Sequence, residues 1–182
     1  GSDSGGGAGI QADLKTFAAL GVHGARAIAC LTAQNPKRVL AIEACSPKML
    51  RRQIEAVFEE IPPAASKTGM LFSVENVRVI ATFFSKAAVH KHPLVVDPVL
   101  NSTSGVELLE PKAVRILQET LLPVATLVTP NLEEAEILSG QTILSVEDMR
   151  GAARKIHSRY GCAALVKGGH LRTASEAVDI FF

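Results

Sequence analysis

The sequence PLVVDP at residues 93–98 is a short run of aliphatic, partly β-branched residues that ends in a carboxylate. Similar apolar runs occupy residues 124–128 and 162–166, and each stops at polar or glycine-rich residues. The segments between these runs carry apolar residues every three or four positions, which is typical of amphipathic helices. Short strands that alternate with helices predict βαβ units and a mostly parallel sheet covered by helices on both faces.

The same alternation extends toward both ends of the chain. Further strands are expected at residues 25–31, 66–70 and 177–182. Helical spacing of apolar residues is found in segments 10–18, 47–58, 73–84, 111–121, 131–140 and 145–160. Ser46, Ser73 and Ser145 stand where a hydroxyl group can cap the first helical turn. No internal repeat or linker divides the sequence, so a single domain is expected over residues 1–182.

Composition limits the class of partner. The 182 residues are 47% hydrophobic, which is too apolar for a disordered chain. The 19 basic and 18 acidic residues leave a net charge of +1, so no strong field favours nucleic acid or an anionic membrane. The apolar runs are also far shorter than the about 20 residues that span a bilayer. Neither nucleic acid nor a membrane is therefore expected as a partner.

The three cysteines, Cys30, Cys45 and Cys162, have no metal-ligand spacing and form no even-numbered set. Each lies in or beside an apolar stretch, so buried reduced thiols are expected. Reduced thiols are typical of a reducing compartment, and the glycine-rich start has no apolar signal-peptide segment. The expected location is the cytoplasm.

Polar residues follow the expected strands at their carboxyl ends, where parallel sheets collect their ligands. These residues are Gln34 and Asn35, Gly69 and Met70, Asp97, Thr129 to Asn131, and Lys167 with Gly168 and Gly169. The amide of Gln34 suits the edge of a heterocycle, although an ordinary turn is the alternative. One edge of the sheet is therefore expected to carry most of the chemistry.

The first nine residues contain five glycines and lead into a helix, whose exposed amides could hold an anion. Their spacing is neither a dinucleotide fingerprint nor a P-loop, which argues against a dinucleotide-dependent enzyme. A flexible turn is the alternative for this loop. Asp13, in the helix that follows, is either a solvated charge or a group that faces a ligand.

Two further motifs each have a structural and a functional interpretation. Asn131 and Glu134 can form a self-contained helix cap, or they can lie near Mg²⁺ and phosphate, because hard oxygen ligands suit that ion. Asp97 occupies a strand end where a carboxylate often organises a metal or a phosphate. Lys167, Gly168 and Gly169 form either a basic turn or a phosphate contact.

Taken together, these motifs resemble the hydroxymethylpyrimidine/phosphomethylpyrimidine kinases of thiamine biosynthesis, in the ribokinase-like superfamily. The matching stretches are GSDSGGGAGIQADLKT (1–16), LTAQN (31–35), KTGML (67–71), VVDPV (95–99), TPNLEEA (129–135) and KGGH (167–170). The resemblance implies a three-layer α/β/α fold with a mostly parallel central sheet. It also implies a homodimer, which is the habit of the family.

The resemblance further implies a role for each matched position. The pyrimidine would contact Ala8, Asp13, Gln34, Met70 and Val99. ATP and Mg²⁺ would lie against Asp97, Asn131, Glu134, Lys167, Gly168 and Gly169, with Asp97 and Glu134 as the carboxylates nearest the metal. The reaction would be phosphoryl transfer from ATP to the hydroxymethyl group, and then to the resulting monophosphate, achieved mainly by positioning and charge neutralisation.

The sequence departs from the family pattern at both ends. Family members have a strand before the first loop, and a later Gly-Thr-Gly-Cys segment that supplies an anion hole and an activating residue. Because these 182 residues contain neither, no catalytic residue is assigned, and the chain alone is expected to be a poor catalyst or inactive. A pyridoxal kinase-like enzyme and a non-catalytic pyrimidine-binding protein are the alternative interpretations.

Overall fold

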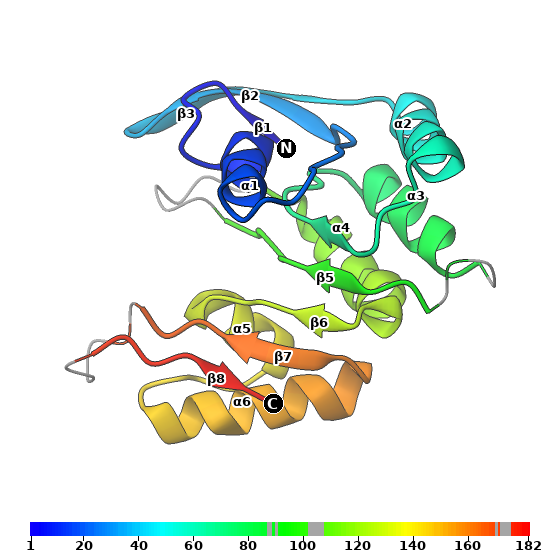
Figure 1. Cartoon of the computed structure of the whole chain (residues 1–182). Coiled ribbons are helices and arrows are strands. Elements are labelled where there is room, and N and C mark those ends of the chain that lie inside the picture. The colour runs from blue at the N-terminus through cyan, green and yellow to red at the C-terminus, as the bar shows by residue number, and fades with distance from the viewer. Residues whose placement is uncertain (87–88, 90, 102–107, 170, 172–175) are drawn as a thin grey trace.

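The computed structural model of the chain describes residues 1–86, 89, 91–101, 108–169, 171 and 176–182. Within them, the central sheet has the strand order β4-β5-β6-β7-β8. Its strands are β4 (Ser66–Thr68), β5 (Leu94–Val96), β6 (Leu127–Val128), β7 (Ala163–Val166) and β8 (Ile180–Phe181). The first four are parallel to one another, and β8 runs antiparallel to β7. The expected mostly parallel sheet is confirmed (Figure 1). His170, at the end of the KGGH stretch, and the polar residues Ser102 to Gly105 lie outside the described residues.

A second, smaller sheet combines β1 (Ser2–Asp3), β2 (Cys30–Asn35) and β3 (Arg38–Ala44). Strand β1 is parallel to β2, whereas β2 and β3 form the antiparallel hairpin at the top of Figure 1. The expected strand at residues 25–31 is thus largely wrong, and β3 was not expected at all. Asn35 explains the hairpin, because its Oδ1 accepts hydrogen bonds from the N–H groups of Lys37 and Arg38 and closes the turn.

The segment before β2 is held without strand pairing. The side chain of Gln53 accepts the N–H of Ile28 at 2.9 Å and donates to its carbonyl oxygen at 3.1 Å. Because a side chain satisfies the backbone groups of Ile28, this residue needs no neighbouring strand.

The helices follow the expected segments closely. They are α1 (Gly9–Ala19), α2 (Pro47–Glu60), α3 (Val74–Phe84), α4 (Pro111–Ile116), α5 (Leu132–Ser139) and α6 (Val146–Tyr160). The hydroxyl groups of Ser46, Ser73 and Ser145 each accept an N–H of the first turn, as expected. At the other end, Gly140 and Gly161 close α5 and α6 in the left-handed conformation, with φ of 68° and 80°.

The strand expected at residues 124–128 is shorter than its apolar run. Helix α4 continues through a wide turn, η1 (Leu117–Leu121), and a tight turn, η2 (Leu122–Val124), before β6 begins at Leu127. Leu117, Leu121 and Leu122 are almost completely buried. Packing of these leucines keeps the chain helical into the run that suggested a strand.

The main core lies between the central sheet and its helices. It contains Leu94 and Val96 of β5, Val128 of β6, Ala164 and Val166 of β7, and Leu117, Leu121, Met149 and Ile156 from the covering helices. Burial of each large aliphatic side chain contributes about 1.5–3 kcal/mol. Helix α1, in contrast, contains no buried residue. No helix among the described residues is long and apolar enough to cross a membrane.

Candidate active site

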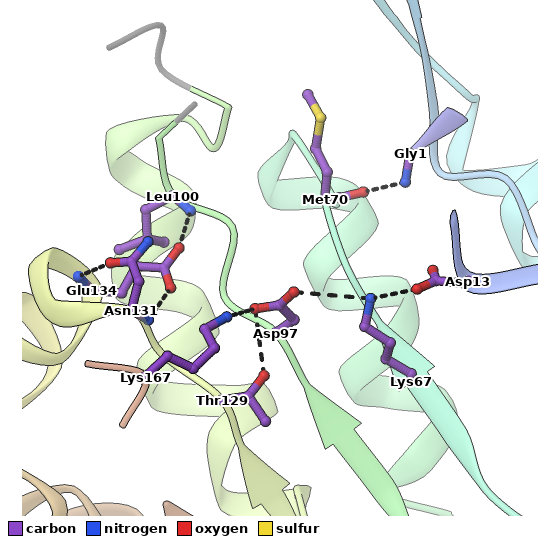
Figure 2. Close-up of polar contacts among 10 residues, drawn as sticks. All are labelled: Gly1, Asp13, Lys67, Met70, Asp97, Leu100, Thr129, Asn131, Glu134 and Lys167. Atoms are coloured by element: carbon purple, nitrogen blue, oxygen red, sulfur yellow. Dashed lines mark hydrogen bonds and ion pairs between the residues drawn. The ribbon is translucent and has the colours of Figure 1, made fainter. Parts of the chain in front are cut away.

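Four charged side chains form an alternating row along the carboxyl edge of the central sheet (Figure 2). Lys167 Nζ lies 3.1 Å from Asp97 Oδ1, and Lys67 Nζ lies 3.9 Å from Asp97 Oδ2 and 3.0 Å from Asp13 Oδ1. The hydroxyl group of Thr129 also donates to Asp97 Oδ1, at 3.4 Å. Parallel pairing of β4, β5, β6 and β7 brings Lys67, Asp97, Thr129 and Lys167 together, because these strands end at one edge. Asp13 reaches the row from helix α1.

The row is balanced in charge and open to solvent. Its side chains are 23% to 40% exposed. Ion pairs of this exposure contribute only about 0–1 kcal/mol each to folding. Four such charges in contact at a strand edge therefore indicate ligand binding more than structural stabilisation.

Asn131 and Glu134 form the helix cap that their spacing allowed. Asn131 Oδ1 accepts the N–H of Glu134, and Glu134 Oε2 accepts the N–H of Asn131, both at 2.9 Å. Glu134 Oε1 also accepts the N–H of Leu100 at 3.1 Å. Burial raises the pKa of Glu134, although these two backbone N–H groups oppose the shift. Glu134 thus fixes the loop after Asp97 to the start of α5.

The first loop closes on a carboxylate of its own. Asp3 Oδ1 accepts the N–H of Gly5 at 2.7 Å, and Oδ2 accepts those of Gly7 at 3.0 Å and Ala8 at 2.8 Å. Of the two interpretations of this loop, anion binding is not available to these three amides, because Asp3 already accepts their hydrogen bonds. Burial opposes the charge on Asp3, but the Gln34 side chain and the three amides outweigh it and lower its pKa.

Gln34 lies beside this loop at the end of β2. The hydroxyl group of Ser4 donates to the carbonyl oxygen of Gln34 at 2.7 Å and accepts its N–H at 2.9 Å. The ladder between β2 and β3 is irregular between Ala33 and Gln34. These contacts join the end of β2 to the first loop.

Met70 and Val99 meet in a small apolar cluster. Buried Met70, Cys30 and Leu108 form its centre, and Val99 and Phe72 pack against them. Val99 and Phe72 have positive φ angles, of 46° and 70°. Such conformations cost non-glycine residues about 1–3 kcal/mol each and are most frequent at functional loops.

Asn76 supports this cluster from α3. Its side-chain nitrogen donates to the carbonyl oxygens of Ala29, at 3.0 Å, and Leu71, at 3.1 Å. Asn76 thereby joins the start of β2 to the loop that carries Met70. The loop geometry is thus set by a buried polar side chain that no sequence pattern singles out.

Gly168 and Gly169 differ in the space available for a side chain. The N–H of Gly168 donates to Asp179 Oδ1 at 3.0 Å, and a Cβ atom there would lie 2.1 Å from the carbonyl oxygen of Val178. A Cβ atom at Gly169 would meet nothing within 4 Å. Close packing therefore requires glycine at residue 168, whereas Gly169 lies in open space beside Lys167.

The structure places the residues selected from the sequence in several separate groups. Ala8 in the first loop and Gln34 at the end of β2 lie against Asp3, whereas Asp13, Asp97 and Lys167 lie in the charged row. Met70 and Val99 share the apolar cluster, and Asn131 and Glu134 form the cap of α5. Sequence reasoning missed the roles of Asp3, Lys67 and Thr129. Asp3 could have been found, because an aspartate just before a glycine run often accepts backbone N–H groups.

The mostly parallel sheet and the charged row at its carboxyl edge indicate a ribokinase-like α/β kinase. Comparison with known proteins gives the same class. The phosphomethylpyrimidine kinase family model matches residues 3–182, and the chain belongs to that family. A hydroxymethylpyrimidine/phosphomethylpyrimidine kinase of Rhizobium meliloti is 49% identical over 186 residues, covering the whole chain and 67% of the relative. The thiamine biosynthesis bifunctional protein ThiED of Geobacter sulfurreducens is 47% identical over the whole chain, which spans 36% of that protein.

Solved structures give the same result. A phosphomethylpyrimidine kinase from Clostridium difficile 630 is 48% identical, with a TM-score of 0.90 over the whole chain and 77% of that structure. The pyridoxal kinase of Bacillus subtilis is 35% identical, with a TM-score of 0.87 over the whole chain and 67% of that structure. The expected family and its ribokinase-like three-layer fold are confirmed.

Proposed function

We propose that the chain forms the pyrimidine- and phosphate-binding part of a hydroxymethylpyrimidine/phosphomethylpyrimidine kinase. The reaction is transfer of a phosphoryl group from ATP to hydroxymethylpyrimidine and then to its monophosphate. The observation that carries the proposal is the row Asp13, Lys67, Asp97 and Lys167, which runs beside the apolar cluster of Met70. An apolar surface for a flat ring next to alternating charges suits an aromatic alcohol and its phosphate ester.

The pyrimidine side comprises Ala8, Asp13, Gln34, Met70 and Val99. Met70 and Val99 supply the apolar contact for the ring, whereas the carboxylate of Asp13 and the amide of Gln34 supply polar partners for ring nitrogens and an amino group. Ala8 supplies the closed loop that borders the ring, since its N–H already donates to Asp3.

The nucleotide side comprises Asp97, Asn131, Glu134, Lys167, Gly168 and Gly169. Lys167 and the open backbone at Gly169 suit the phosphates of ATP. Gly168 helps to position Lys167 and Gly169 through its close packing, and Asn131 does so by capping α5.

The donor set fits Mg²⁺ only together with phosphate. Asp97 offers a partly exposed carboxylate, whereas both oxygens of buried Glu134 accept backbone N–H groups, so Glu134 would act through a water molecule. The described residues contain no group of three or more acidic, histidine or cysteine side chains that could hold an ion. When bound, the ion would neutralise charge on the transferred phosphoryl group.

The direct test is ATP-dependent phosphorylation of hydroxymethylpyrimidine. The 182-residue chain is compared with a longer form of the protein that carries a Gly-Thr-Gly-Cys segment. We expect turnover by the longer form and a rate at least about 10²–10³-fold lower from the chain alone, as for loss of an anion-hole donor. Comparable turnover by the two forms would contradict the expected need for that segment, and no turnover by either would contradict the kinase assignment.

Likeness to pyridoxal kinases supports a second candidate function. Pyridoxal kinases of Bacillus subtilis and Staphylococcus aureus are 33–35% identical to the chain. A substrate panel decides, since a pyridoxal kinase would phosphorylate pyridoxal at the higher kcat/KM. Tight pyrimidine binding without ADP release by any form would favour a binding protein instead.

We also propose that the protein is a cytoplasmic homodimer. Leu31 and Leu40, on the β2–β3 hairpin, are 50% and 59% exposed, which favours cover by a second copy. Cys30 and Cys162 are buried free thiols, which suits a reducing compartment. Sedimentation velocity and cell fractionation test these two statements.

A further inference from the structure

Lys67 is a cation of the candidate site to which neither the sequence analysis nor the family resemblance assigned a role. It lies in the middle of β4, with its Nζ 3.0 Å from Asp13 Oδ1 and 3.9 Å from Asp97 Oδ2. A Cβ atom at Gly69 would lie 3.8 Å from this Nζ, so the ammonium group extends over the backbone just before Met70. Figure 2 shows Lys67 between the two carboxylates.

The two lysines of the row lie on opposite sides of Asp97. Lys167 contacts Oδ1 from the side expected to bind the nucleotide, and Lys67 approaches Oδ2 from the side of Asp13 and Met70. Lys67 is therefore at the junction between the expected pyrimidine pocket and the expected phosphate region.

Lys67 also has donors left for a ligand. An ammonium group carries three N–H donors, and among the described residues Lys67 donates one hydrogen bond, to Asp13. Its side chain is 34% exposed, and its distance to Asp97 is longer than a hydrogen bond. An incoming anion can thus reach the ammonium group while the contact to Asp13 persists.

The second of the two proposed transfers requires such a cation. An oxygen of the acceptor's phosphate forms a bond to the γ-phosphorus of ATP, while the bond from that phosphorus to the departing ADP oxygen breaks. Two anions therefore meet, and Asp97 adds a third negative charge between them. Lys167 can neutralise the donor side only, because it lies beyond Asp97.

We infer that Lys67 binds the phosphate of the monophosphate acceptor and selects the phosphorylated pyrimidine over the unphosphorylated one. The inference rests on the proposed function. It differs from a structural role, in which Lys67 would merely join α1 to β4 through Asp13, because a structural role would affect both pyrimidines equally.

Binding to the chain itself, measured by calorimetry without nucleotide or Mg²⁺, tests the inference. Hydroxymethylpyrimidine and its monophosphate are each titrated into the wild type, K67M, K67R and K15M. The control Lys15 is a comparable lysine of α1 that donates to the carbonyl oxygen of Gly6. Circular dichroism confirms that each variant is folded.

We expect K67M to weaken monophosphate binding by about tenfold or more, as for a lost hydrogen bond to a charged group, and hydroxymethylpyrimidine binding by less than about threefold. K67R should retain most of the preference, and K15M should change neither affinity. Equal weakening of both ligands, or no change in K67M, would overturn the inference. If the wild type binds neither pyrimidine, the proposed function itself fails.

Discussion

The first loop and the carboxyl edge of the central sheet look alike in sequence, since both contain glycine-rich stretches next to strands. They differ in whether their polar groups are already hydrogen-bonded within the chain. In the first loop, the amides of Gly5, Gly7 and Ala8 already donate to Asp3. At the sheet edge, Asp97 and Lys167 pair with each other but remain partly exposed. Exposed amides bind an external anion only where no carboxylate of the chain reaches them first.

The difference separates a structural region from a chemical one. The first loop has a buried, fully bonded carboxylate, so its contribution should be to stability and to the shape of the pocket. The charged row contributes little to stability and should determine binding and transfer. Substitutions in the two regions should therefore separate loss of activity from loss of stability.

Asp97→Asn should cause the largest change, and it should be confined to activity. Loss of the carboxylate at the centre of the row should lower kcat/KM for phosphoryl transfer about 10²–10³-fold, measured in the form that shows turnover in the test proposed above. The urea midpoint should change little, because the pairs of Asp97 are partly exposed. If the variant unfolds at a lower urea concentration and loses activity only in proportion to the unfolded fraction, the role of Asp97 is structural.

Asp3→Asn should show the opposite behaviour. The change removes the charge that accepts three backbone N–H groups at a buried site, so the free energy of unfolding should fall by about 2–4 kcal/mol. The lowered pKa means that this stabilisation is present above the unfolded-state value near 3.8 and is lost as the pH falls through the folded-state value.

Asp13→Asn is the matched control for Asp3, because its carboxylate forms only a partly exposed ion pair. Its effect on stability should stay below about 1 kcal/mol. Urea unfolding of both variants between pH 3 and pH 7 measures the contrast. Equal losses in the two variants would remove the distinction between the closed loop and the open row.

Gly168→Ala and Gly169→Ala test the same contrast within two adjacent residues. A methyl group at residue 168 would overlap a backbone carbonyl and the side chain of Met149, so a loss of about 1–3 kcal/mol is expected. At residue 169 the methyl group meets open space, and thermal unfolding should be nearly unchanged. A larger loss from Gly169→Ala would contradict the structure of this loop.

His92 gives the smallest effect, at the opposite edge of the sheet. Its ring packs against Phe58 and Phe84, its Nε2 lies 2.9 Å from Ser66 Oγ, and burial lowers its pKa. Because the folded state binds the proton less well, stability should be full above the ordinary value near pH 6.5 and should decline as the pH falls below it. His92→Gln should reduce the decline in the free energy of unfolding between pH 7 and pH 5. An unchanged decline would show that other groups cause it.

Several elements were predictable because their signals are local. Ser46, Ser73 and Ser145 cap their helices as their positions indicated, and Asn131 forms the expected cap with Glu134. The hairpin of β2 and β3 was missed, because Asn35 closes a turn that resembles any polar loop after a strand. The strand expected at residues 124–128 was too long, since burial of Leu121 and Leu122 extends the helical segment.

The site was predictable only in part for the same reason. Asp97 and Lys167 stand at strand ends and were selected there, whereas the role of Lys67 depends on where Asp13 comes to lie. These two residues are 54 positions apart in the sequence. No local sequence pattern predicts that two residues so far apart along the chain form a contact.

Sequence patterns were sufficient to predict the alternation of strands and helices, the caps, the family and the edge at which ligands are expected. These properties depend on hydrophobic periodicity and on hydrogen bonds within a few residues. Only the folded chain shows that Lys67 lies between Asp13 and Asp97 and so joins the two halves of the row. This outcome depends on how α1 lies beside β4, which places charged groups within hydrogen-bonding distance although they are 54 positions apart along the chain.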